Sequence, residues 1–106
     1  MVDLSELQKE VYDNKVKHGF NTTNIAEEFC LALTELAEAY KALSLTDKNE
    51  LAEELADVII YLLGIAEMQG VQIEPALVAK IEKNRRRRYY RREDGSWAKT
   101  EDNEPI

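Results

Sequence analysis

Apolar residues recur at helical spacing along most of this chain, and they hardly ever alternate with polar residues as in a strand. The pattern predicts four helices. The first covers residues 4–17, and the second runs from the capping run at 21–24 to about residue 43. The third begins after a cap at Thr46 or Asp47 and ends near residue 69, and the fourth runs from 73 to about 91. Gly19 and Gly70 stand where the first and third helices are expected to end. We therefore predict an all-α bundle of four main helices.

The apolar stripes of these helices identify the expected core. The second helix, with Thr23 as its N-cap, is centred on Leu36, and the third helix is centred on Leu55. Phe20 is expected to be a buried anchor between the first two helices. Pro75 is expected at the first position of the fourth helix. The residues expected to face inward are Ile25, Phe29, Ala32, Leu33, Leu36, Tyr40 and Leu43, then Leu51, Leu55, Val58, Ile59, Leu62 and Ala66, then Leu77, Val78 and Ile81.

The length of 106 residues suits one domain, which we expect to span 1–92. After Arg92 the helical pattern stops, and a turn at 93–96 leads into a polar, acidic stretch. Residues 93–106 are therefore expected to form a loosely held tail. Because a bundle this small buries only a modest share of its surface, oligomerisation is expected as well.

The cellular setting is expected to be the cytoplasm. Cys30 is the only cysteine, so no internal disulfide can form, and the N-terminus lacks the basic and apolar pattern of a signal peptide. The longest apolar run, 58–66, is far shorter than the ~20 residues of a membrane span. We therefore expect no membrane partner.

Two carboxylate pairs carry the candidate chemistry, and each has the spacing i, i+3 that places both acids on the same side of a helix. They are Glu35 with Glu38, and Glu54 with Asp57, on successive predicted helices. Acids gathered in apolar surroundings need a compensating charge, and Mg²⁺ prefers hard oxygen ligands of this kind. The residues thus favour a divalent metal site. The alternative is structural, with Asp57 a buried acid paired to an arginine or lysine.

Six arginines between positions 85 and 92 raise the question of nucleic acid. The net charge of −7 and the absence of a nucleic-acid-binding motif argue against it. Basic residues near a helix C-terminus also interact favourably with the helix dipole, which explains them without a nucleic acid. We therefore expect no nucleic-acid partner, and expect one or two of these arginines to contact phosphate.

The motifs together resemble the MazG-like nucleotide pyrophosphohydrolases of the all-α NTP pyrophosphatase superfamily. The matching elements are Glu35-Leu-Ala-Glu38-Ala, Glu53-Glu54-Leu-Ala-Asp57-Val and Lys80-Ile-Glu-Lys-Asn84 with Arg87 after it, and the resemblance covers about residues 5–92. It implies Mg²⁺-dependent hydrolysis of (deoxy)nucleoside triphosphates to the monophosphate and pyrophosphate, in order to clear the nucleotide pool. It also implies a homodimer or homotetramer, with active sites completed across subunit contacts.

The resemblance assigns roles to individual residues. It implies that Glu35, Glu38, Glu54 and Asp57 bind Mg²⁺, for which Mn²⁺ can substitute, and that Lys80 and Asn84 approach the nucleotide. Glu38 is our candidate for the general base. Lys80 and Arg87 are candidates to neutralise the departing pyrophosphate.

Four further residues are candidates for contact with the substrate. Family members commonly carry a tryptophan near the base, but the only tryptophan here is Trp97, so Phe20, Tyr40 or Tyr61 is left for that role. His18 is most simply a solvated loop residue, although it also lies where it can reach the base or the sugar. The remaining alternatives are an enzyme like phosphoribosyl-ATP pyrophosphatase and a non-catalytic helical module whose acids pair with the arginines.

Overall fold

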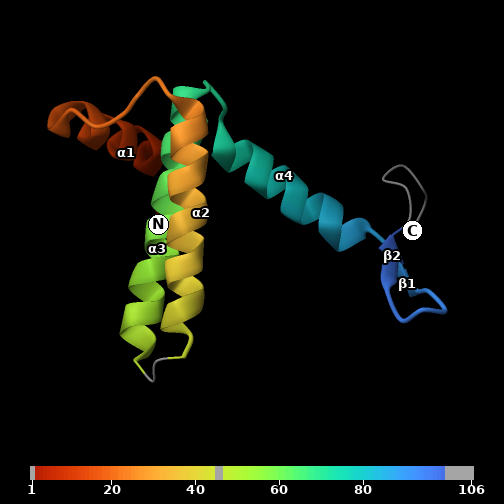
Figure 1. Cartoon of the computed structure of the whole chain (residues 1–106). Coiled ribbons are helices and arrows are strands. Elements are labelled where there is room, and N and C mark those ends of the chain that lie inside the picture. Colours follow the sequence, from red (N-terminus) through yellow and green to blue (C-terminus); the bar gives the residue numbers. More distant parts are fainter. Residues whose placement is uncertain (1, 45–46, 100–106) are drawn as a thin grey trace. The chain divides into compact units, whose positions relative to one another are not determined.

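The computed structural model describes residues 2–44 and 47–99, and it contains the four expected helices in the expected order (Figure 1). They are α1 Leu4–His18, α2 Ile25–Ala42, α3 Lys48–Met68 and α4 Ile73–Arg86, followed by two short strands, β1 Tyr89–Arg91 and β2 Trp97–Lys99. The chain is therefore mostly helical. It divides into two compact units, Met1–Ile73 and Glu74–Ile106. None of the described helices combines the length and the apolar character needed to cross a membrane.

Short polar side chains start the helices of the first unit. The Asp3 carboxylate accepts hydrogen bonds from the backbone N–H groups of Ser5 and Glu6, and Asp47 caps α3 in the same way. The expectation that Thr23 caps α2 was wrong, because Asn24 is the N-cap and accepts from the N–H of Glu27 at 3.1 Å. Thr46, the other cap considered for α3, lies outside the described residues.

Helices α2 and α3 lie side by side as an antiparallel pair and form the body of the first unit (Figure 1). Three of the four buried residues of α2 are alanines, namely Ala32, Ala39 and Ala42, while α3 buries its segment from Leu63 to Ala66. Because alanine side chains are short, the two backbones can approach closely. This alanine contact sets the spacing between the helices.

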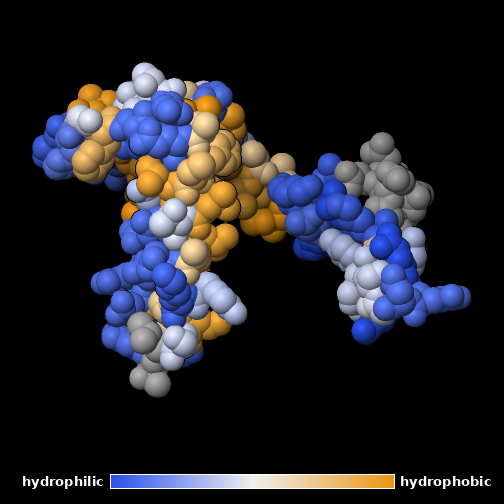
Figure 2. Space-filling view, viewed as in Figure 1, coloured by the Kyte–Doolittle hydropathy of each residue, from blue (hydrophilic) through white to orange (hydrophobic). Residues whose placement is uncertain are grey.

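Most of the large side chains expected in the core are instead exposed. On α2 the expected stripe centre, Leu36, is exposed together with Phe29, Leu33, Tyr40 and Leu43. The same correction applies to Leu55, Ile59 and Leu62 on α3, and to Leu77, Val78 and Ile81 on α4. The alanine flank of α2 makes the close contact, so the larger side chains of the first unit form an apolar surface over α2 and α3 (Figure 2).

Helix α1 packs on α3 around a glycine and a buried amide. A Cβ at Gly64 would stand 3.5 Å from carbon atoms of both Val11 and Lys15, so the glycine allows α1 to come close. The Gln8 side chain, 1% exposed, donates to the carboxylate of Glu67 at 3.0 Å and to the carbonyl of Val71 at 2.8 Å. Gln8 thus fixes α1 to the C-terminal end of α3.

A buried ion pair joins α1 to α2. The ammonium group of Lys15 lies 2.5 Å from the carboxylate of Glu28, which is 1% exposed. The second oxygen of Glu28 accepts from the amide of Asn21 at 3.0 Å, and the amide oxygen of Asn21 accepts from the N–H groups of Thr23 and Asn24. Both oxygens of Glu28 are therefore satisfied, and the connection between the helices is organised around it.

The second unit differs from the expectation at its C-terminal end. Helix α4 stops at Arg86 rather than near residue 91, and Pro75 stands at its third position rather than its first. Like charges one turn apart in the arginine run disfavour a helix, whereas tyrosines favour strands. The turn expected at 93–96 joins the paired strands β1 and β2, while positions 100–106 of the expected tail lie outside the described residues.

The buried ion pair yields a test of stability. Lys15→Met leaves the Glu28 carboxylate buried without its cation, so we expect the free energy of unfolding in urea to fall by about 3–5 kcal/mol. The double variant Lys15→Met/Glu28→Leu removes both charges and should recover most of that loss. Lys41→Met is the matched control, because Lys41 pairs with Glu38 at 3.5 Å on the surface and its loss should cost less than about 1 kcal/mol. Equal losses for the two lysine variants would contradict the assignment.

Candidate functional site

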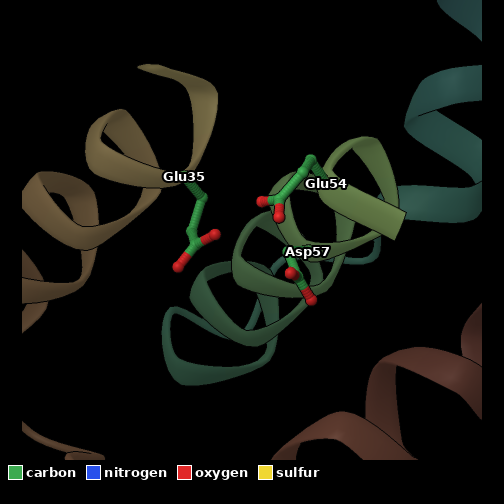
Figure 3. A group of neighbouring side chains, drawn as sticks. All are labelled: Glu35, Glu54 and Asp57. Atoms are coloured by element: carbon green, nitrogen blue, oxygen red, sulfur yellow. The ribbon is translucent and has the colours of Figure 1, made fainter. Parts of the chain in front are cut away.

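Three of the four predicted acids meet between α2 and α3. Glu35 lies midway along α2, and Glu54 and Asp57 lie one turn apart on α3. A carboxylate oxygen from each of the three lies within 4.8 Å of the others, and the side chains point toward one another (Figure 3). The i, i+3 spacing places Glu54 and Asp57 on one side of α3, and the close packing of α2 brings Glu35 to both of them.

The electrostatics of this cluster favour a bound cation. Burial raises the pKa of Glu54, and the charges of Asp57, Glu35 and Glu38 raise it further. Within residues 2–44 and 47–99, no lysine or arginine forms an ion pair with Glu35, Glu54 or Asp57. The described residues therefore do not form the alternative arrangement, in which Asp57 is a structural acid paired with a basic residue. Asp57 is exposed rather than sitting in dry surroundings. Three hard oxygen donors with uncompensated charge match the requirements of Mg²⁺ or Mn²⁺.

Glu38 stands apart from the three. Its side chain is about half exposed, and it pairs with Lys41 at 3.5 Å. Its charge still raises the pKa of Glu54, so it belongs to the surroundings of the cluster, but its carboxylate is not one of those within 4.8 Å.

A cavity of about 530 Å³ opens between α1 and α3 beside the acids. Tyr61, one turn after Asp57, lines it together with the ion pair of Lys15 and Glu28. The pKa of the Tyr61 phenol is raised by burial and then by the charges of Glu35, Glu28 and Asp57. Tyr61 therefore links the acid cluster to the cavity, which is otherwise mainly apolar.

The aromatic candidates separate into two places. Phe20 and Tyr61 line this cavity, whereas Tyr40 lies in a different groove of α2 and α3. The expectation that Phe20 is buried was wrong, since it is 57% exposed. The ring of His18 stacks on that of Phe20 with centroids 5.3 Å apart, which places the histidine beside a residue of the cavity wall.

The remaining predicted residues, Lys80, Asn84 and Arg87, belong to the second unit. There the guanidinium of Arg87 donates to the side-chain oxygen of Asn84 at 2.9 Å. Lys80 lies on α4, one turn before Asn84.

Sequence reasoning missed the polar residues that line the cavity. Glu28 and Lys15 carry no motif, and a buried pair of opposite charges is visible only when α1 and α2 are placed together. A weak signal did exist, because Glu28 precedes Glu35 by seven residues and so falls on the same side of the helix.

The crowding of acids yields a prediction about pH. Because the folded state raises the pKa of Glu54, its charged form destabilises the protein once the pH exceeds the ordinary carboxyl range. In metal-free buffer we expect Glu54→Gln to raise the melting temperature at neutral pH. The gain should vanish as the pH falls below the pKa of an unfolded glutamate, where Glu54 is protonated in both states. Calorimetry from pH 3 to pH 8 measures this, and a gain that is independent of pH would refute the clustering.

Comparisons with known proteins identify the family of this chain. The model of the MazG-like family matches residues 24–102. Among solved structures, the chain is similar to the MazG-like pyrophosphohydrolase of cyanophage S-2L bound to dGDP and three catalytic Mn²⁺ ions per active site. The TM-score is 0.67 and the sequence identity 27%, over 95% of this chain and 100% of that one. A comparison with curated proteins gives no match. Because the family match covers most of its length, this chain belongs to the MazG-like family.

Proposed function

We propose that the protein hydrolyses (deoxy)nucleoside triphosphates to the monophosphate and pyrophosphate with Mg²⁺ or Mn²⁺, and that it clears the nucleotide pool of the cytoplasm. The observation that carries the proposal is the meeting of Glu35, Glu54 and Asp57 between two helices. Membership of the MazG-like family and the dGDP and Mn²⁺ of the cyanophage protein support it.

The acids provide the ligands for the metal. Glu35, Glu54 and Asp57 would hold it, with Glu38 joining by a change of rotamer that releases Lys41. When bound there, the ion would act as a Lewis acid toward phosphate oxygens and would make a water more acidic. Once it has released Lys41, Glu38 would also accept a proton from the attacking water, through an oxygen that the metal does not use.

The cavity is suited to the base and sugar. Its mainly apolar wall offers the ring of Phe20 for stacking, while Asn14 and Tyr61 offer hydrogen-bonding groups. Tyr61 adjoins both the acids and the cavity, so a nucleotide with its phosphates at the metal would extend its base past Tyr61. His18, stacked on Phe20, would lie near the rim.

Lys80 and Arg87 are the proposed cations for the departing pyrophosphate, because they stand in the family motif that the sequence resembles. Asn84, which accepts a hydrogen bond from Arg87 at 2.9 Å, would orient its guanidinium. Arg85 and Arg86 pair with Glu82 rather than with the acid cluster, which disfavours a non-catalytic module held together by such pairs.

We further propose a homodimer or homotetramer. Leu33, 65% exposed, and its large apolar neighbours on α2 and α3 would be covered in such an assembly. A groove of about 520 Å³ on the same helices would accept side chains of a second copy. It is lined by Leu36, Ala39, Tyr40, Leu43, Leu51 and Leu55.

The activity is tested with a panel of (d)NTPs and Mg²⁺ or Mn²⁺, assayed for pyrophosphate. We expect Glu54→Gln and Asp57→Asn to abolish both the activity and the rise in melting temperature that the metal causes. Glu38→Gln should lower kcat about 10²–10⁴-fold. Glu53→Gln is the matched control, because Glu53 precedes Glu54 but is not part of the cluster. Orthophosphate as the sole product would mean that a different bond is cut.

The assembly is tested by light scattering after gel filtration. We expect Leu33→Glu to shift the protein toward the monomer, because the charge would be buried in the interface. Thr34→Glu is the control, since Thr34 is the exposed polar neighbour of Leu33 and the mass should not change. A wild type that runs as a monomer would refute the proposed assembly.

A further inference from the structure

The two strands of the second unit form a hairpin with defined pairing. Tyr89 pairs with Lys99, Tyr90 with Ala98, and Arg91 with Trp97. The N–H of Arg92 donates to the carbonyl of Ser96 at 2.7 Å, and Gly95 adopts φ +89°, which closes the three-residue loop. The side chains along β1 and β2 therefore have fixed sides.

One side of the hairpin combines aromatic rings with cations. Because successive side chains of a strand point to opposite faces, Tyr89, Arg91, Trp97 and Lys99 share one face, and Tyr90 and Ala98 share the other. The guanidinium of Arg91 lies 5.4 Å from the ring of Trp97, which confirms that these two are on one side. Tyr89 is 51% exposed and Trp97 is 60% exposed. We call these four residues the aromatic–cationic face.

Positive charge is concentrated around this face. Seven of the chain's fourteen basic residues fall between positions 85 and 99, against two acids, Glu93 and Asp94, and two of the seven, Arg85 and Arg86, are paired with Glu82. The Asp94 carboxylate is occupied locally, since it accepts from the hydroxyl and the N–H of Ser96. Within the described part of the chain, Arg91 and Arg92 donate to neutral oxygens of Gly95 and Ser96, so their charge is not cancelled there.

From this geometry we infer that the aromatic–cationic face binds single-stranded nucleic acid. Exposed rings accept unpaired bases by stacking, and neighbouring cations attract the phosphates between them. A duplex offers no free base faces, and an acidic peptide gains little from two flat rings. The net charge of −7 belongs to the chain as a whole, whereas the residues of this hairpin carry a local excess of positive charge. In the strand pairing, Arg91 and Lys99 stand beside aromatic rings.

The inference does not depend on the proposed hydrolysis, and Trp97 provides the readout. It is the only tryptophan, so its fluorescence reports on this hairpin alone. Titrating the full-length protein in EDTA with a 15-nucleotide oligothymidylate should quench the fluorescence. Anisotropy of the labelled oligonucleotide should give the same affinity, which should weaken with salt. Absence of quenching and of an anisotropy change at low salt would overturn the inference.

Two tyrosines of similar exposure offer a matched comparison. We expect Tyr89→Leu to weaken binding about tenfold, since stacking contributes about 1–3 kcal/mol per base. Tyr90→Leu, on the opposite face and 56% exposed in the wild type, should change it less than about twofold. Equal effects of the two substitutions would mean that the sides are not distinguished and would refute the assigned face.

Further variants separate stacking from charge and from loss of structure. Trp97→Leu should weaken binding about tenfold, whereas Trp97→Phe keeps a ring and should retain most of the affinity. Arg91→Gln should reduce the slope of log affinity against log salt by about 0.7. If Trp97→Leu and Trp97→Phe weaken binding to the same extent, the aromatic ring has no role in binding. Equal binding of duplex DNA or polyglutamate would identify a general polyanion surface, and complete displacement by an equal phosphate concentration of dTTP would identify a nucleotide site. Each of these results contradicts the inference.

Discussion

The packing of α2 on α3 through alanines is the constraint on which the site depends. Carboxylates repel one another, so Glu35, Glu54 and Asp57 stay within 4.8 Å only because two helices hold them there. Short side chains at Ala32 and Ala39 allow this approach. Larger residues at these positions would separate the helices and disperse the acids. Burial and the charges of the neighbouring acids raise the pKa of Glu54, and a bound cation would relieve that repulsion.

That packing also determines what remains on the surface. With the alanine flank turned inward, Leu33, Leu36 and Tyr40 are left exposed, and they form an apolar surface on the first unit. Buried polar contacts hold α1 in place within the first unit. Gln8 binds α3, and the ion pair of Lys15 and Glu28 joins α1 to α2. The same ion pair lines the otherwise mainly apolar cavity between α1 and α3, together with Tyr61.

Several features followed directly from the sequence. Helical periodicity predicted all four helices, and capping residues and glycines placed most of their ends within a residue or two. The i, i+3 pairs identified the acids that meet, since this spacing fixes the side on which they project whatever surrounds the helix. The motifs also indicated the MazG-like family, to which the chain belongs. These properties are local, so a single segment carries the information.

Other features depend on segments that are distant along the chain, and only the tertiary structure decided them. Leu36 was a sound choice for a stripe centre, but which flank of a helix is buried depends on the partner's surface. The pairing of Lys15 with Glu28 and the separation of Glu38 from the three acids have the same origin. Beyond Arg86, the pairing of β1 with β2 replaced the end of the expected helix and set the sides of the hairpin. Sequence fixes what each segment can form, and the contacts between segments fix which groups meet.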